Sequence, residues 1–157
     1  MTTAAMNTIN CRTTRFGEIE VEEDLVITLP GGLIGFEECR RFVVVHAGEK
    51  NPFRWFQSID DGTVAFPIID PWEFKPDYSP TISDADAAQL GIDDESPKLI
   101  FAVVTIPRQD PRRVTANLLG PIVINPLKRV GKQVIVADEH YGAKHSIMDE
   151  MNRKAAA

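Results

Sequence analysis

Residues 99–104 read LIFAVV, the longest unbroken run of apolar side chains in this 157-residue chain. Successive residues of a β-strand point to opposite faces, so a strand that is apolar at every position is buried on both sides. Residues 42–45 (FVVV) have the same character, whereas residues 19–22 (IEVE) alternate and predict a half-exposed edge. The two apolar runs therefore predict central strands. Even the longer one is far below the roughly 18 residues that a transmembrane helix needs.

Eleven prolines and ten glycines divide the rest of the chain into short segments rich in Val, Ile and Phe, which is typical of a β-sandwich or barrel. Pro67 removes one hydrogen-bond donor from its segment, so we expect an edge position or a bulge there. The segments that read as strands are 14–21 (a hairpin turning near Gly17), 25–29, 42–46, 53–59, 64–70, 99–106, 113–118, 121–125 and 133–137. This pattern predicts a mostly β fold, a small antiparallel β-barrel-like single domain with one or two short helices.

The helices and the domain limits follow from local signals. Ser83 is a suitable N-cap for a helix over 84–90, and Gly91 can supply a left-handed stop. A second short helix is expected from Ser146 onward. We divide the chain into a flexible N-terminal extension (1–13), a β-barrel domain (14–145) and a C-terminal tail (146–157).

The charge balance limits the classes of function. The chain has 17 basic and 23 acidic residues and a formal net charge of −6, which argues against a phosphate-binding surface and favours a basic partner. Residues 1–14 lack the apolar core of a signal peptide, so we expect a cytoplasmic protein without membrane contact. Cys11 and Cys39 are then expected to be free thiols.

Candidate catalytic and metal-binding residues are few. Cys39 precedes two arginines that would favour a thiolate, but no cysteine-histidine-asparagine signature surrounds it, so a thiol enzyme is a minor alternative. His140 and His145 are five residues apart, which puts them on neither one face of a helix nor one face of a strand. Residues 31–35 are glycine-rich without a nucleotide-binding motif and are expected to form a turn. A binding module without metal or cofactor is favoured over an enzyme.

Five stretches and two single residues stand in an order that carries a family resemblance. They are 29–37 (LPGGLIGFE), 55–58 (WFQS), 65–71 (AFPIIDP), 115–125 (TANLLGPIVIN) and 131–135 (GKQVI), followed by Tyr141 and His145. Together they resemble the FliW family of flagellar assembly factors over about residues 14–145. Residues 1–13 have no counterpart in the family pattern.

The resemblance implies a small antiparallel β-barrel protein that is not an enzyme and needs no cofactor. Proteins similar to this bind CsrA, a basic translational regulator that represses flagellin mRNA, and also bind flagellin, and the two partners compete. It implies no direct contact with nucleic acid. The alternative is a small β-barrel module that binds single-stranded nucleic acid, since barrels of this size often do. A monomer is expected, because no strand is long, flat and apolar enough to offer an open edge.

For partner contact we select Asp70, Trp72, Phe74 and Tyr78. The segment 71–82 combines three prolines with three aromatic side chains, and long irregular connections are more often functional than passive. Aromatic side chains are also the usual anchors of protein interfaces. The open alternative is that Trp72 and Phe74 fold under and close one end of the barrel.

Overall fold

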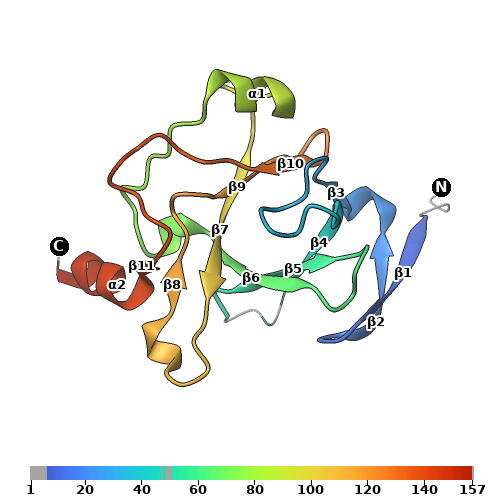
Figure 1. Ribbon diagram of the computed structural model, residues 1–157, viewed down its shortest axis with the longest axis horizontal. Helices are drawn as coiled ribbons and strands as arrows, with labels where there is room; N and C mark the ends of the chain where they lie inside the picture. The colour runs from blue at the N-terminus through green and yellow to red at the C-terminus, as the bar shows by residue number, and fades with distance from the viewer. Residues whose placement is uncertain (1–6, 47, 49–50, 157) are drawn as a thin grey trace.

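The computed structural model describes residues 7–46, 48 and 51–156. Within these residues seven strands close a barrel (Figure 1), which confirms the predicted mostly β, barrel-like fold. Neighbouring strands are antiparallel except for β3 and β10, which run parallel. Around the barrel the strands are β7 (Leu99–Thr105), β6 (Ala65–Ile69), β5 (Arg54–Ser58), β4 (Arg41–His46), β3 (Ile27–Thr28), β10 (Val130–Gln133) and β9 (Ile122–Asn125), which pairs with β7 again.

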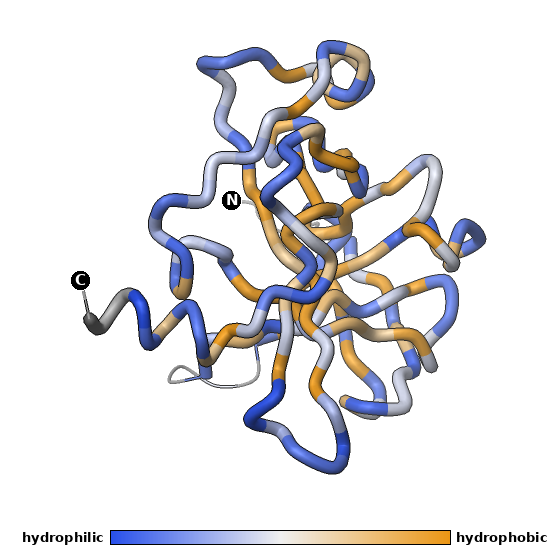
Figure 2. The backbone as a smooth tube through the Cα atoms, turned by 60° about the vertical axis from the view of Figure 1, so that its left-hand side comes forward, coloured by the Kyte–Doolittle hydropathy of each residue, from blue (hydrophilic) through white to orange (hydrophobic). Residues whose placement is uncertain are grey.

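Strands β6, β7 and β9 are buried on both faces, because their residues are shared between two separate cores. Inside the barrel, the rings of Phe42 and Phe56 stack with centroids 4.4 Å apart, and Phe101 of β7 joins the same cluster. The next residue, Ala102, belongs to an outer core that residues 71–92 and 134–141 cover. Figure 2 shows the apolar residues gathered in the middle of the molecule and hydrophilic residues at the loop tips. The predicted central strands are therefore confirmed.

Pro67, which has no backbone N–H, lies in β6 at a position that pairs with only one neighbouring strand. It pairs with Trp55 of β5, while the pairing of β6 with β7 begins only at Ile68. At Pro67 the strand therefore has one strand partner instead of two, as expected for an edge position.

The predicted flexible extension over residues 1–13 is wrong for residues 8–13. They form β1 (Thr8–Thr13), which pairs antiparallel with β2 (Gly17–Glu22), and residues 1–6 lie outside the described residues. The hairpin turns over residues 14–16, earlier than predicted, and Gly17 adopts φ 71° at its end. Such a ribbon is mostly exposed, so its apolar period is weak and does not mark the first strand.

The hairpin docks on the turn that joins β5 and β6. The Thr14 N–H donates to the Gly62 carbonyl oxygen at 3.1 Å, and the Arg15 guanidinium carbon lies 3.9 Å from the ring centroid of Trp55. A Cβ atom at Gly62 would lie 1.8 Å from the carbonyl oxygen of Arg12. Only glycine permits this approach of two backbones, so residues 8–13 belong to the folded domain.

Both predicted helices are present. In α1 (Asp84–Leu90) the Ser83 side chain accepts from the Asp86 N–H at 3.1 Å, and Gly91 ends the helix with φ 69°. Helix α2 (Ile147–Ala156) follows β11 (His145–Ser146), which pairs with β8 (Thr115–Ala116). Short 3-10 turns are η1 (Glu23–Leu25), η2 (Pro71–Glu73) and η3 (Pro111–Arg113). Among the described residues, no helix is long and apolar enough to cross a membrane.

Candidate functional site

The segment 71–82 leaves β6 through η2 and crosses the outer core. Asp70 caps η2, because its side-chain oxygen accepts from the Trp72 N–H at 2.9 Å, and Pro71 supplies the fixed φ of the first position. Two tyrosines anchor the far end: the Tyr78 hydroxyl donates to the Leu118 carbonyl oxygen at 2.8 Å, and the Ser79 N–H donates to the Tyr141 hydroxyl at 2.8 Å. The segment is therefore irregular but held at both ends.

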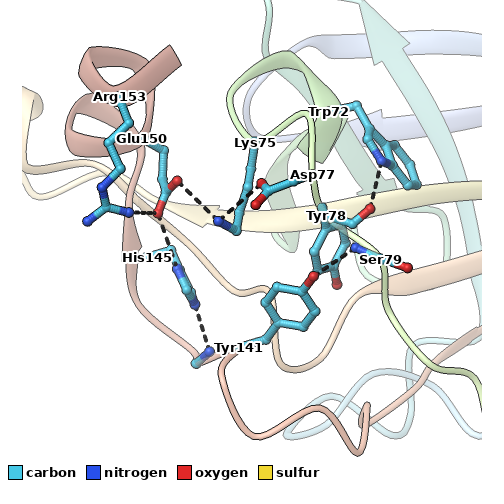
Figure 3. A network of polar contacts seen from close by, with 10 residues as sticks. Trp72, Lys75, Asp77, Tyr78, Ser79, Tyr141, His145, Glu150 and Arg153 are labelled. Atoms are coloured by element: carbon cyan, nitrogen blue, oxygen red, sulfur yellow. Dashed lines mark hydrogen bonds and ion pairs between the residues drawn. The ribbon is translucent and has the colours of Figure 1, made fainter. Parts of the chain in front are cut away.

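Trp72 is the exposed aromatic residue of this segment. Its side chain keeps 39% exposure, and its indole Nε1–H donates to the Tyr78 carbonyl oxygen at 2.9 Å (Figure 3). The polar edge of the ring is thus satisfied internally, and the part that faces solvent is apolar. A fixed aromatic side chain loses little entropy on binding, which is a property of interface anchors.

The structure corrects the predicted contact set. Phe74 is 0% exposed and Tyr78 3% exposed, so both belong to the outer core and neither is an exposed anchor, although Tyr78 also lines the groove beside Trp72. Burial also raises the pKa of Tyr78. The alternative interpretation, in which the aromatic residues fold under, is confirmed for Phe74. Trp72 remains at the surface, and Asp70 lies half-buried as a cap.

A groove of about 690 Å³ runs beside Trp72, between residues 78–82 and α1. Its apolar lining includes Ile82, Ala87, Ile92 and Ile100, and its charged lining includes Asp84, Asp93, Asp94 and Lys98. We call this the Trp72 groove. An apolar floor with a mainly acidic rim suits an apolar segment that carries positive charge at its borders.

The acids of the rim differ in how they are engaged. Asp93 accepts from the Ser96 hydroxyl at 2.9 Å and from the Glu95 N–H at 2.9 Å, and these bonds lower its pKa. Lys98 donates to the Ser96 carbonyl oxygen at 3.2 Å. Within the described part of the chain, the carboxylates of Asp84 and Asp94 have no side-chain hydrogen bond or ion pair. A cationic group of a partner could therefore bind Asp84 or Asp94 without breaking a side-chain hydrogen bond or ion pair within this chain.

A polar cluster lies where α2 meets the segment 71–82 (Figure 3). Glu150 is 7% exposed; its carboxylate contacts Lys75 Nζ at 3.3 Å and Arg153 Nη1 at 2.6 Å. Lys75 also contacts Asp77 at 3.3 Å. Burial alone would lower the pKa of Lys75, but the bonds to Glu150 and Asp77 raise it above its ordinary value, so the lysine stays charged.

His145 completes this cluster as a neutral side chain. Its Nε2 accepts from the Gly142 N–H at 2.7 Å, which places the ring proton on Nδ1, 3.8 Å from the Glu150 carboxylate. Burial lowers the pKa of His145, and this effect outweighs the opposite effect of Glu150. At neutral pH the contact between His145 and Glu150 is therefore not an ion pair.

Lowering the pH is expected to destabilise the fold through His145. Its folded pKa lies below the unfolded value of about 6.5, so the unfolded chain binds more protons in this range. The contribution of His145 is complete above about pH 6.5 and is lost as the pH falls toward the folded pKa. Urea unfolding at about pH 7.5 and about pH 5.5 measures the loss, which should be smaller in His145→Gln. An equal loss in both proteins would assign the pH dependence to other groups.

Other predicted sites have structural roles. Cys11 and Cys39 are buried free thiols, as predicted, and the described residues hold no cluster of three or more potential metal ligands. Residues 31–35 form the expected turn, with φ 65° at Gly32 and φ 88° at Gly35. Beside this turn lies a second groove of about 540 Å³, which the end of α1 and β10 also line.

Sequence reasoning missed Glu150 and Lys75. Glu150 is one of several charged residues in the C-terminal segment, and its burial has no local signal because its partner is 75 residues away. Asp84 stands in the first turn of a helix, where an acidic residue is expected for the helix dipole alone, so its sequence position does not mark it as part of a groove. Trp72, which the composition of the segment singled out, is the selected aromatic residue that lies at the surface.

Comparisons with known proteins agree with this structure. The family model described as FliW protein matches residues 10–147. Flagellar assembly factor FliW of Natranaerobius thermophilus is 39% identical over 140 residues, which cover 89% of this chain and 93% of that protein. Flagellar assembly factor FliW of Geobacter sulfurreducens is 38% identical over 148 residues, which cover 94% of this chain and 92% of that protein.

A solved structure is also similar. The crystal structure of the flagellar assembly factor FliW superposes with a TM-score of 0.81 at 33% identity, and the match covers 88% of this chain and 96% of that chain. The matched range 10–147 includes most of β1, the segment 71–82, α1 and the start of α2, so the expectation that residues 1–13 lack a counterpart in the family is wrong for residues 10–13. This chain belongs to the FliW family.

Proposed function

We propose that this chain is a flagellar assembly factor that works by binding proteins in the cytoplasm and catalyses no reaction. Its partners are CsrA and flagellin, which compete for it, and it acts as a monomer. Family membership supports the flagellar role, since the relatives above carry the name flagellar assembly factor. The observation that carries the binding role is Trp72, fixed by its indole hydrogen bond at the edge of an apolar groove with unpaired acids on the rim.

The electrostatics favour a basic partner. The net charge of −6 and the carboxylates of Asp84 and Asp94 attract a cationic protein and speed its encounter, so association should weaken as salt is added. Competition needs only that one partner bind the factor less well when the other is bound. Flagellin would then release CsrA to repress flagellin synthesis, and export of flagellin would reverse this.

The test is a calorimetric titration of the purified protein with CsrA, repeated after saturation with flagellin. Saturable binding that flagellin abolishes is the expected result. No binding of either folded partner would leave the family membership intact and overturn the proposed partners. A titration with single-stranded RNA at low salt separates the alternative function, because a nucleic-acid-binding module would bind under these conditions.

Trp72→Ala is expected to weaken partner binding strongly while leaving the fold nearly intact. Loss of an interface anchor costs about 2 kcal/mol or more, which is roughly a thirtyfold loss of affinity. The free energy of unfolding should fall by only about 1 kcal/mol, because the ring is partly exposed and loses one hydrogen bond.

The matched control is Ile106→Ala. Ile106 has 41% exposure against 39% for Trp72 and does not line the Trp72 groove. It should bind both partners with the affinity of the wild type. Equal losses in the two variants, or no loss in Trp72→Ala, would remove the groove as the binding surface.

A further inference from the structure

Glu150, at 7% exposure, is the only charged residue that is buried in the described part of the chain. Burying a charge costs free energy unless the charge is paired and hydrogen-bonded, so the partners of Glu150 must compensate for its burial. One partner, Arg153, belongs to the same helix and has a largely exposed side chain. The other, Lys75, is 75 residues away, and its side chain is 13% exposed. Glu150 therefore links α2 to the segment that carries Trp72.

The backbone of Lys75 takes part in two hydrogen bonds that fix the surroundings of Trp72. Its N–H donates to the Pro71 carbonyl oxygen at 2.9 Å, which closes the turn that contains Trp72. Its carbonyl oxygen accepts from the Tyr78 N–H at 3.0 Å, and the Tyr78 carbonyl oxygen in turn holds the indole of Trp72 at 2.9 Å. Restraining Lys75 thus restrains the turn below Trp72 and the acceptor of its ring.

Helix α2 is itself held by few contacts. A helix of ten residues is marginal in isolation, so α2 depends on what it packs against. Ile147 is buried in the outer core, whereas Met148 and Met151 are exposed. The Ile147 N–H also donates to the Val114 carbonyl oxygen at 3.1 Å, and the Glu150 cluster is a further attachment one turn along the helix (Figure 3). An element with so few buried apolar side chains belongs to the least stable part of a fold.

We propose that Glu150 is a positioning residue for the Trp72 groove: by binding Lys75, docked α2 holds Trp72 in the geometry that a partner meets. The inference rests on the proposed function for its biological meaning, but the link between α2 and Trp72 is measurable without any partner. Under this inference α2 controls the geometry of the Trp72 groove although no residue of α2 lines that groove.

Lys75→Met is the decisive variant, because it cuts the link without leaving Glu150 unpaired. Arg153 remains 2.6 Å from the carboxylate, so α2 should keep its hydrogen-exchange protection. The amides of residues 71–78 should exchange about tenfold faster, since a charge-assisted hydrogen bond contributes on that scale. The indole N–H resonance of Trp72 should move, while that of Trp55 stays in place.

Glu150→Gln tests the same link from the other side, with Asp149→Asn as its control. Both substitutions remove one negative charge from α2, but Asp149 is exposed. Glu150→Gln should speed exchange in α2 and in residues 71–78 and shift the Trp72 indole signal, whereas Asp149→Asn should change neither. If Glu150→Gln fails to fold, Lys75→Met decides alone.

Two results would overturn the inference. In the first, the indole signal of Trp72 and the exchange of residues 71–78 stay as in the wild type in Lys75→Met. In the second, Glu150→Gln loosens α2 alone. Titration of Lys75→Met with CsrA and flagellin adds a separate readout, in which affinity should fall toward that of Trp72→Ala. If the wild type binds neither partner, the proposed function fails, while exchange still decides whether Glu150 positions Trp72.

Discussion

Phe74→Ala is expected to lower the free energy of unfolding by about 3–5 kcal/mol, the usual loss when a buried phenylalanine is truncated. Phe74 is 0% exposed and packs in the outer core with Ile69 and Tyr78. The vacated volume lies between barrel strands and the segments 71–92 and 134–141, and neighbours in a packed core relax only in part, so a cavity remains. Urea or thermal unfolding measures the loss directly.

The comparison with Trp72→Ala makes this result specific. The two residues are two positions apart in one segment, yet the first should mainly change stability and the second mainly change binding. If Phe74→Ala keeps the stability of the wild type and loses partner affinity, then Phe74 is exposed in solution. The outer core described here would then be wrong at that position.

Gly62→Ala is expected to cost on the order of 3 kcal/mol, the upper range for adding a methyl group to a filled site. The new Cβ would lie 1.8 Å from the carbonyl oxygen of Arg12 and 3.0 Å from its carbonyl carbon. Both atoms belong to backbone, which cannot move aside as a flexible side chain can. The hairpin β1–β2 must therefore shift, and hydrogen exchange should show its amides losing protection first.

Gly31→Ala is the matched control. No heavy atom lies within 4 Å of a Cβ built at Gly31, and its φ is not in the left-handed region. The same substitution should therefore change the free energy of unfolding by less than about 1 kcal/mol. Similar losses at the two glycines would show that the approach of Arg12 to Gly62 does not constrain the hairpin.

The barrel could be predicted because burial on both faces leaves a clear pattern. Residues 42–45 and 99–104 are apolar at every position. In the structure residues 99–104 contribute to both cores, while Phe42 lies in the inner core and Val43 is buried outside both clusters. Residues 8–13 could not be assigned in the same way. Of that strand only Cys11 and Thr13 are buried, so its pairing depends on a backbone approach at Gly62 that leaves no periodic signal.

For the candidate site, the sequence marks the irregular segment but not which of its side chains face solvent. Prolines and aromatic residues mark the segment 71–82, but an irregular segment has no period that tells which side chains face inward. Phe74 and Tyr78 are buried while Trp72 is not. Which of these side chains turns inward depends on tertiary packing against β7 and residues 134–141, which are distant in the sequence. The bond between Lys75 and Glu150 depends on tertiary placement in the same way.

Closure of the barrel determines how much of the chain must be synthesised before the domain can fold. Thr28 pairs with Val130, about 100 residues later, and β7 needs β9 to close the ring. At about 5–20 residues per second, the ribosome delivers that partner strand roughly 5–20 s after β3 has been made. Tyr141, which secures Ser79, arrives later still. A nascent chain therefore cannot complete the segment that carries Trp72 until nearly all of the chain has been translated, and a product that terminates before Tyr141 lacks the hydrogen bond that secures Ser79.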